Sequence, residues 1–342
     1  MSDSAPSDRL EQRTKGSQYW MRLLIDVNRW VLVAVILVVV FCLLVITSEL
    51  GLASFRQIAT SQNAVRYLFS PFIGAIITGT SIVVTINQLV LSQELGAVGD
   101  QRSRMQEAMK FQTDVESKLD IPISDPEPTA FLGELVDGIR TRANRLAETA
   151  TDEPGAKRAE LIDELVADVT QNAEAVSEDL EGARFGSFDV IHAALNFNYS
   201  RKIHEARRIR THHEEALSTE ADETLEELID LLQFFGEARE HFKTLYFQWE
   251  LINLSRALLY IAVPALVVVG VFLMYVDATT WYGTTLGVDN LVWLASGGFA
   301  FGLSPFVVFI VFILRIATVA KHTLAMGPFI LRQTERETRS NE

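Results

Sequence analysis

Four long stretches of the chain contain no charged residue, and this feature limits the possible folds more than any other. They lie between Arg29 and Glu49, between Arg66 and Glu94, between Arg256 and Asp277, and between Asp289 and Arg315, and they hold 19, 27, 20 and 25 residues. An α-helix of about 20 mostly apolar residues crosses the hydrocarbon core of a bilayer. The sequence therefore predicts an all-α integral membrane protein with four transmembrane helices, over residues 30–48, 67–92, 257–276 and 290–314.

Basic residues predict which side of the membrane each connection faces, because Lys and Arg are enriched in cytoplasmic segments. They gather at the two ends of the chain, as Arg9, Arg13, Lys15, Arg22 and Arg29 before span one and as Lys321, Arg332, Arg336 and Arg339 after span four. The connection between spans three and four has none, and Arg56 and Arg66, between spans one and two, are the two that disagree. We expect a cell-membrane protein with both termini in the cytoplasm.

The four spans form two hairpins separated by a large insert. The expected parts are a cytoplasmic N-terminal segment (1–29), a transmembrane hairpin (30–98), a cytoplasmic helical domain (99–250), a second transmembrane hairpin (251–318) and a cytoplasmic C-terminal tail (319–342). Residues 101–250 carry 17 Lys and Arg against 32 Asp and Glu, which disfavours nucleic-acid binding. This acidity is typical of halophilic proteins, whose charge keeps them soluble; the alternative is a vestibule that attracts cations.

Apolar residues recur every three or four positions along the insert, which predicts amphipathic helices. Three such stretches cover residues 132–146, 161–180 and 190–216, with breaks at 120–128, 151–155 and 182–186. A further helix begins at Thr219 and keeps the near-heptad apolar spacing of a coiled coil as far as Trp249. No proline follows before Pro264 in span three, so this helix is either a rod that transmits movement to the membrane or an inert stalk.

Span two carries polar and small residues along one edge. We call this set the polar stripe; its members are Ser70, Gly74, Thr78, Ser81, Thr85, Gln88 and Ser92. All seven fall within about 40° of one line down a helix. Because unsatisfied polar groups are costly in hydrocarbon, the stripe is expected to face other helices or water. It is either a pore lining, with the six residues from Gly74 to Ser92 as candidates, or a surface for tight helix packing.

Two pairs of glycines have separate interpretations. Gly96 and Gly99 follow span two and predict a hinge between that span and the insert. Gly298 and Gly302 in span four have the GxxxG spacing of a close helix crossing, so we expect them to serve helix packing.

The sequence contains little that indicates catalysis or metal binding. No charged residue or histidine lies inside the four blocks, which disfavours ion-coupled transport. Cys42 is the single cysteine, and the adjacent His212 and His213 point in different directions on a helix, so we predict no metal site and no cofactor. The basic segment 201–210 either binds an anion or lipid headgroup or pairs with the acidic segment 220–230. The chain lacks the phosphate-loop, hydrolase and kinase motifs, and we expect no enzyme.

Two functions remain. The first is a passive homo-oligomeric channel in the lipid bilayer, lined by span two and regulated by the cytoplasmic helices. In the order of its elements the chain is similar to bestrophin-type anion channels, although that family's aromatic neck and acidic calcium-binding residues have no counterpart here. The second is a membrane-anchored scaffold or signal relay whose cytoplasmic helices bind an unidentified protein partner.

Overall fold

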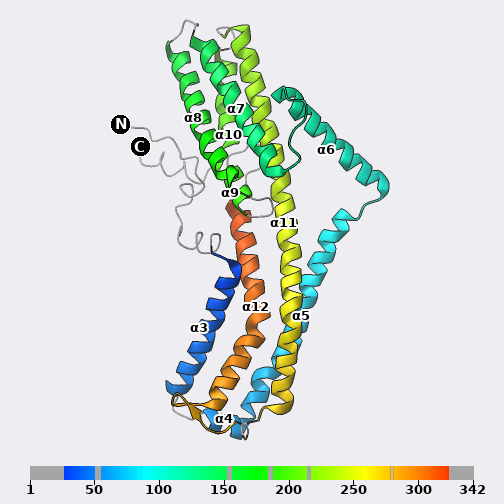
Figure 1. Cartoon of the computed structure of the whole chain (residues 1–342), viewed down its shortest axis with the longest axis vertical. Coiled ribbons are helices and arrows are strands. Elements are labelled where there is room, and N and C mark those ends of the chain that lie inside the picture. The colour runs from blue at the N-terminus through cyan, green and yellow to red at the C-terminus, as the bar shows by residue number, and fades with distance from the viewer. Residues whose placement is uncertain are drawn as a thin grey trace. The chain divides into compact units, whose positions relative to one another are not determined.

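The computed structural model describes residues 27–50, 55–151, 156–183, 188–213, 217–277, 279 and 281–322. These residues are almost entirely helical (Figure 1). Four helices are long and apolar enough to span a membrane, namely α3 (Arg29–Leu50), α5 (Ala64–Glu94), α11 (Thr219–Tyr275) and α12 (Asn290–His322). The prediction of a helical chain with four candidate spans is therefore confirmed.

Some of the predicted features fall outside the described residues. These are the basic residues Arg9, Arg13, Lys15, Arg22, Arg332, Arg336 and Arg339, and residues 152–155 and 184–187, which hold most of two predicted breaks. The remainder divides into two compact units. We call the described residues of Gly96–Phe247 and Ala320–His322 the acidic unit, and those of Tyr19–Leu95 and Gln248–Val319 the apolar unit. Helix α11 contributes residues to both.

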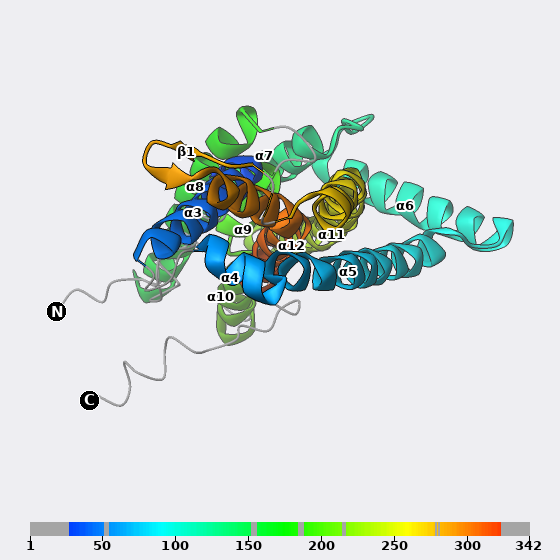
Figure 2. The ribbon, with the colours of Figure 1, turned by 90° about the horizontal axis from the view of Figure 1, so that it is seen from below.

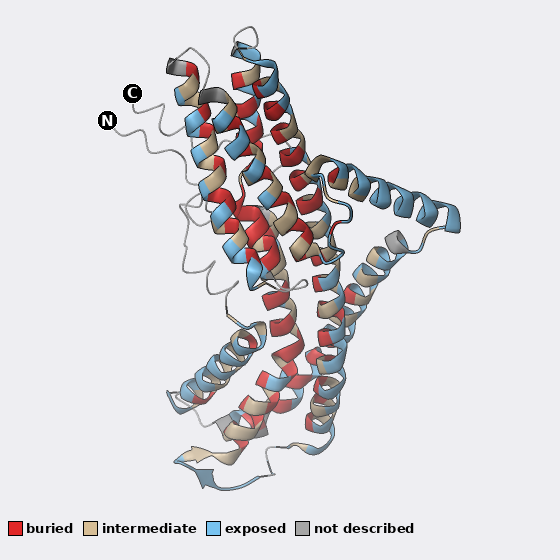
Figure 3. Cartoon of the chain, turned by 45° about the horizontal axis from the view of Figure 1, so that its top comes forward, coloured by how far each residue is buried: buried red, intermediate tan, exposed pale blue. Residues whose placement is uncertain are grey.

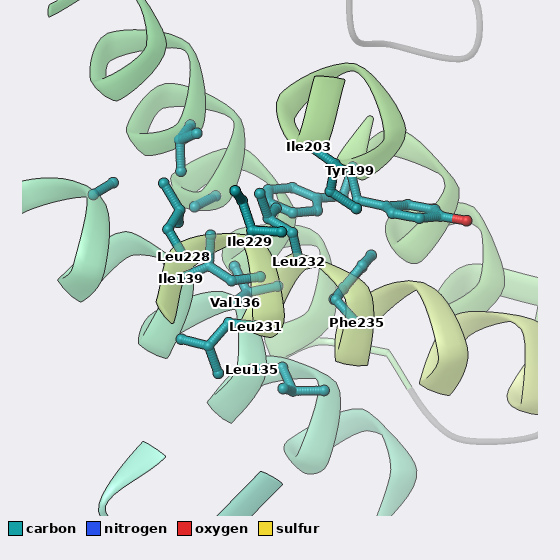
Figure 4. Close-up of a cluster of buried hydrophobic side chains, with 14 of the residues drawn as sticks. Leu135, Val136, Ile139, Tyr199, Ile203, Leu228, Ile229, Leu231, Leu232 and Phe235 are labelled. Atoms are coloured by element: carbon teal, nitrogen blue, oxygen red, sulfur yellow. The ribbon is translucent and has the colours of Figure 1, made fainter. Parts of the chain in front are cut away.

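The acidic unit is a bundle of helices. It contains α6 (Val98–Leu119), α7 (Pro128–Thr151), α8 (Ala156–Glu181), α9 (Phe188–Asn196), α10 (Tyr199–His213) and the first part of α11. Helix α7 packs on α8, and α8 packs on α9 and α10. The apolar positions that the helical period predicts for α7 are fully buried: Leu132, Leu135, Val136, Ile139, Ala143 and Leu146. Side chains of α7, α10 and α11 meet in this core (Figure 4), and burying each large one stabilises the fold by about 1.5–3 kcal/mol.

The stretch 190–216 was predicted as one helix, but its described part, residues 190–213, belongs to two helices separated at Phe197 and Asn198. The buried Asn172 of α8 lies at this break. Its Nδ2 donates to the carbonyl of Asn196 at 2.9 Å, and the amide of Asn198 donates to its Oδ1 at 3.4 Å. A helix end leaves backbone groups without partners inside the helix. The prediction was wrong because an amide from another helix supplies those partners, and the local period carries no trace of it.

In the apolar unit, α5 packs its apolar face against α11 and α12. Phe69 stacks on Phe272 of α11 with ring centroids 4.3 Å apart, and Phe72 meets Phe299 of α12 edge to face at 5.1 Å. Ile76 and Val83 continue the same buried face. The described residues of α3 are mostly exposed (Figure 3). Proline does not end any of the three long helices, since Pro71, Pro264 and Pro305 lie inside α5, α11 and α12.

The two short connections of the apolar unit carry α4 (Phe55–Gln62) and a β-hairpin. Strands β1 (Thr284–Thr285) and β2 (Val288–Asp289) pair antiparallel, with Thr284 opposite Asp289 and Thr285 opposite Val288. The hairpin is the pair of arrows labelled β1 in Figure 2. It lies between the end of α11 and the start of α12 in the sequence.

Candidate functional site

The polar stripe lies on α5, and we call it the α5 stripe from here on. Its residues all lie on the exposed side of α5 in the single chain. Ser70, Gly74, Thr78, Ser81, Thr85, Gln88 and Ser92 are each exposed, whereas Phe69, Phe72, Ile76 and Val83 are buried. A Cβ added to Gly74 meets no atom within 4 Å, while one at Gly79, outside the stripe, lies 3.8 Å from the ring of Phe306. No helix of the described part of the chain covers the stripe.

Three hydroxyl groups of the stripe form hydrogen bonds within their own helix. Ser81 Oγ donates to the carbonyl of Ile77 at 2.8 Å, and Thr85 Oγ1 donates to the carbonyl of Ser81 at 2.9 Å. Ser92 Oγ donates to the carbonyl of Leu89 at 2.7 Å. Such bonds satisfy the hydroxyl donor without a neighbouring helix. In a bilayer, these bonds would lower the cost of exposing the three residues to lipid.

Ser70, Thr78 and Gln88 differ from the other three polar stripe residues. None of these three makes a side-chain hydrogen bond to the described part of the chain. The Gln88 amide carries two N–H donors and an oxygen with two lone pairs, all of which need partners away from water. Gln88 is therefore the stripe residue with the strongest need for water or for a polar group from another molecule.

Residues 95–97 are not helical and separate α5 from α6. Gly96 lies in the break, and Gly99 lies in the first turn of α6. Ala97, which precedes α6, has an extended backbone with φ −61° and ψ 153°. The structure thus places one glycine of the predicted hinge pair in the break and the other in a helix.

Gly298 and Gly302 lie where α12 approaches α11. A Cβ added to Gly298 would be 2.2 Å from Cζ of Phe272, and one added to Gly302 would be 3.2 Å from Cγ2 of Val269. Real Cβ atoms essentially never approach closer than 3.0 Å. The absence of a side chain at Gly298 is what leaves room for the Phe272 ring.

One ion pair that sequence reasoning missed joins α4 to the hairpin. Arg56 donates from Nε to Oδ2 of Asp289 at 2.7 Å and from Nη2 to Oδ1 at 2.6 Å. Its Nη2 also donates to the carbonyl of Trp281 at 3.1 Å, and its guanidinium lies 4.8 Å from the ring centre of Tyr282. The hydrogen bond from Arg56 lowers the pKa of the Asp289 carboxyl below its ordinary value. The sequence signal that could have predicted this pair was the presence of one arginine and one aspartate of opposite charge in the short connections between apolar blocks.

A second ion pair joins the start of α3 to α11. Arg29 Nη1 lies 2.8 Å from Oε2 of Glu250, whose side chain is 3% exposed, and the Arg29 guanidinium lies 4.9 Å from the ring centre of Phe312 in α12. A buried carboxylate is costly unless a cation pairs with it. This pair therefore ties three helices of the apolar unit together.

The basic segment 201–210 finds carboxylate partners on two different helices. Arg210 pairs with Asp222 at 2.7 Å and with Glu226 at 3.0 Å, both on α11. Arg201 and Lys202 instead pair with Asp168 of α8, at 2.5 and 2.9 Å. Burial raises the pKa of the Asp168 carboxyl, but the charge of Lys202 and the hydrogen bonds from both cations outweigh it and lower that pKa.

A polar hollow of about 590 Å³ lies between α10 and α11. Basic and acidic side chains both line it, including Arg207, Arg210 and Asp230.

His212, one of the two adjacent histidines considered for metal binding, contacts its own helix. Its Nδ1 lies 3.0 Å from the carbonyl oxygen of Arg208, one turn earlier. Within the described ranges, no group of three or more His, Cys, Asp or Glu side chains is arranged to hold a metal ion.

Comparison with known proteins identifies a family but no characterised relative. Neither a curated protein nor a solved structure matches this chain. A family model described as "Family of unknown function (DUF7972)" matches residues 1–342, the whole of the sequence. The chain therefore belongs to the DUF7972 family.

Proposed function

We propose that this protein is a multi-pass protein of the cell membrane whose copies assemble around α5 to form a passive channel. The observation that carries this proposal is the exposure of the whole α5 stripe in the single chain. In a bilayer, such an edge contacts lipid, another copy or water. Thr78 and Gln88 disfavour lipid, because their polar groups have no partner in the described part of the chain. The stripe then faces other copies of α5 or the water between them.

The aromatic residues of the apolar unit support a membrane placement. Trp and Tyr are enriched where a bilayer meets water. Trp249 and Tyr275 are exposed and lie at two levels of α11, separated by about 39 Å at 1.5 Å per residue. A bilayer with its headgroups is about 40–45 Å thick. The two residues therefore match the two surfaces of a membrane.

The ion pair of Arg56 with Asp289 supports the hairpin arrangement, because it joins the two short connections at one end of the apolar unit. Arg56 and Arg66 are still the two exceptions to the positive-inside rule, which counts Lys and Arg whether or not a carboxylate is nearby. The basic residues at the two ends of the chain outnumber them, so the proposed orientation keeps both termini in the cytoplasm.

Passive conduction fits the spans better than ion-coupled transport does. Coupled transporters commonly use an ionisable group within the membrane, and the four blocks contain none. A lining of hydroxyl, amide and glycine groups offers hydrogen bonds to water without a fixed charge. The competing role of the α5 stripe is dry packing between copies of α5.

The test is the flux of thallium and iodide into liposomes that contain the purified protein. Thr78→Leu and Ser81→Leu place bulky apolar groups on the stripe, so we expect each to reduce the flux about tenfold or more. Val39→Leu changes an exposed residue of α3 and serves as the matched control, with unchanged flux. Unchanged flux in both stripe variants would remove α5 from the pore, and wild-type vesicles no leakier than empty ones would refute conduction.

A second candidate function is a membrane-anchored scaffold, and α6 favours it. Residues 98–110 are exposed throughout, including Val98, Met105 and Met109 at 83%, 65% and 61%. Exposed flexible apolar side chains are common on protein-binding surfaces. Capture of the same specific protein from membranes by the full-length chain, lost in Met105→Glu with Met109→Glu, would favour this role over conduction.

A further inference from the structure

We propose that the hairpin Trp281–Asp289 is a rigid interfacial anchor, which inserts Trp281, Tyr282 and Leu286 into the headgroup layer of the lipid bilayer. This inference rests on the proposed membrane placement of α11 and α12, and it does not depend on conduction. The partner is the lipid surface beside the protein.

The tip of the hairpin presents an apolar side chain in an unusual backbone conformation. Leu286 and Gly287 form the two-residue loop between β1 and β2, and both have positive φ, at 54° and 83°. This pattern is that of a type I′ turn, in which Asn or Gly is favoured at the first position. A bulky residue with positive φ is uncommon. Leu286 is nevertheless 89% exposed, so no contact within the described chain explains its presence.

The hairpin is held firmly from its base. Arg56 binds both Asp289 and the carbonyl of Trp281. The amide of Asn290 donates to the carbonyl of Gly283 at 3.0 Å, Thr285 Oγ1 donates to Asn290 Oδ1 at 2.6 Å, and Trp293 Nε1 donates to the carbonyl of Thr285 at 3.0 Å. The exposed apolar groups are therefore presented by an ordered structure.

The composition of the hairpin fits the headgroup layer. Residues 278–288 contain no charged residue. Trp281 and Tyr282 are 61% and 71% exposed, beside small and hydroxyl-bearing neighbours. Large amphipathic rings among uncharged residues are typical of a membrane interface, where the ring contacts lipid and its polar group contacts water.

The short distance of Leu286 from α12 and the small apolar surface of the hairpin favour lipid over a protein partner. Leu286 is four residues before the start of α12, which limits its distance from that end of the span to about 14 Å even in an extended chain. Two aromatic side chains and one leucine offer at most about 600 Å². A stable protein interface takes about 800 Å² from each partner. The hairpin is thus near the bilayer surface and too small to hold a second copy by itself.

Depth-dependent quenching tests this anchor in the full-length protein reconstituted in liposomes. In a Cys42→Ala background, the thiol of Leu286→Cys is labelled with the fluorophore NBD. Substitution and labelling should affect folding little, because Leu286 lies at the loop tip and is 89% exposed. Val39→Cys on the exposed face of α3 is the control for hydrocarbon, and Glu223→Cys on the exposed face of α11 in the acidic unit is the control for water.

The label at Leu286→Cys should be quenched most by lipids with a nitroxide near the headgroup, and iodide in the buffer should quench it about fivefold less than at Glu223→Cys. Iodide quenching equal to that at Glu223→Cys would overturn the anchor, and protection from both quenchers would overturn it too, since protein would then cover the tip. The proposed membrane placement is tested separately, because it predicts that Val39→Cys is quenched by nitroxides deep in the acyl chains whatever the hairpin does.

Discussion

Arg56 and Asp289 lie 233 residues apart in the chain and form a two-pronged ion pair, with Nε to Oδ2 at 2.7 Å and Nη2 to Oδ1 at 2.6 Å. Asp289 Oδ1 also accepts the backbone amide of Leu291 at 2.9 Å, in the first turn of α12. A carboxylate in this position caps a helix N-terminus and interacts favourably with its dipole. The single pair therefore connects α4, the hairpin and the beginning of α12.

Replacing Arg56 should destabilise the apolar unit. Arg56→Ala removes both hydrogen bonds to Asp289. It is expected to lower the free energy of unfolding by about 1 kcal/mol, because the pair is partly exposed. Arg56→Lys keeps the charge but cannot form the planar two-pronged contact, so we expect an intermediate loss. Thermal unfolding of the protein in nanodiscs measures both. The control is Arg66→Ala, an exposed arginine without an ion pair in the described part of the chain; an equal loss in that variant would argue against a specific role for Arg56.

The same pair predicts a pH dependence. The hydrogen bond from Arg56 lowers the pKa of Asp289 below 3.8 in the folded protein. A carboxyl group with a lowered folded-state pKa binds protons more weakly when folded, so its contribution is complete above the unfolded value and declines as the pH falls below it. The stability difference between the wild type and Asp289→Asn should therefore be constant near neutral pH and shrink below about pH 4. A difference that stayed constant to about pH 3 would contradict this assignment.

Gly298 provides a test of the contact between α11 and α12. Gly298→Ala places a methyl group against the Phe272 ring, and we expect a loss of about 1–3 kcal/mol from overpacking. Gly270→Ala in α11 is the matched control, because a Cβ there meets nothing within 4 Å. Unfolding in nanodiscs should show the loss for Gly298→Ala alone, and equal stability of the two variants would mean that Gly298 does not set this approach.

Gly236 has the corresponding role in the acidic unit. A Cβ added there would lie 2.5 Å from the ring of Tyr199, the residue that begins α10. The guanidinium of Arg239 also packs on this ring, 4.5 Å from its centre. We expect Gly236→Ala to lower the melting temperature of the full-length protein, whereas Gly133→Ala in α7, where the added Cβ meets nothing, should keep or raise it. A lower melting temperature for both would indicate a general effect of substitution.

The four long apolar helices and the buried helix faces could be predicted from the sequence because their signals are local. A charge-free block or an apolar period of three and four residues is visible in one segment, and the apolar positions of that period between Leu132 and Leu146 are buried as it indicates. The break before Tyr199 depends on Asn172, and the partner of Arg56 is far away in the chain. Interactions of that kind leave no periodic signal. For the α5 stripe, the spacing predicted that the seven residues share one side of the helix. It could not predict that the other helices leave this side exposed in the single chain.

The reaction of thiols along α5 with a membrane-impermeant maleimide tests the central claim, a water-lined edge on α5, most directly. Single cysteines replace Thr78, Ser81 and Thr85 in a Cys42→Ala background, in liposomes, with the buried Ile76→Cys and the exposed Val39→Cys of α3 as controls. A channel lined by α5 predicts labelling at all three stripe positions and none at either control. Silence at all three positions, in protein that is shown to be folded and oligomeric, would contradict it and leave dry packing as the role of the stripe.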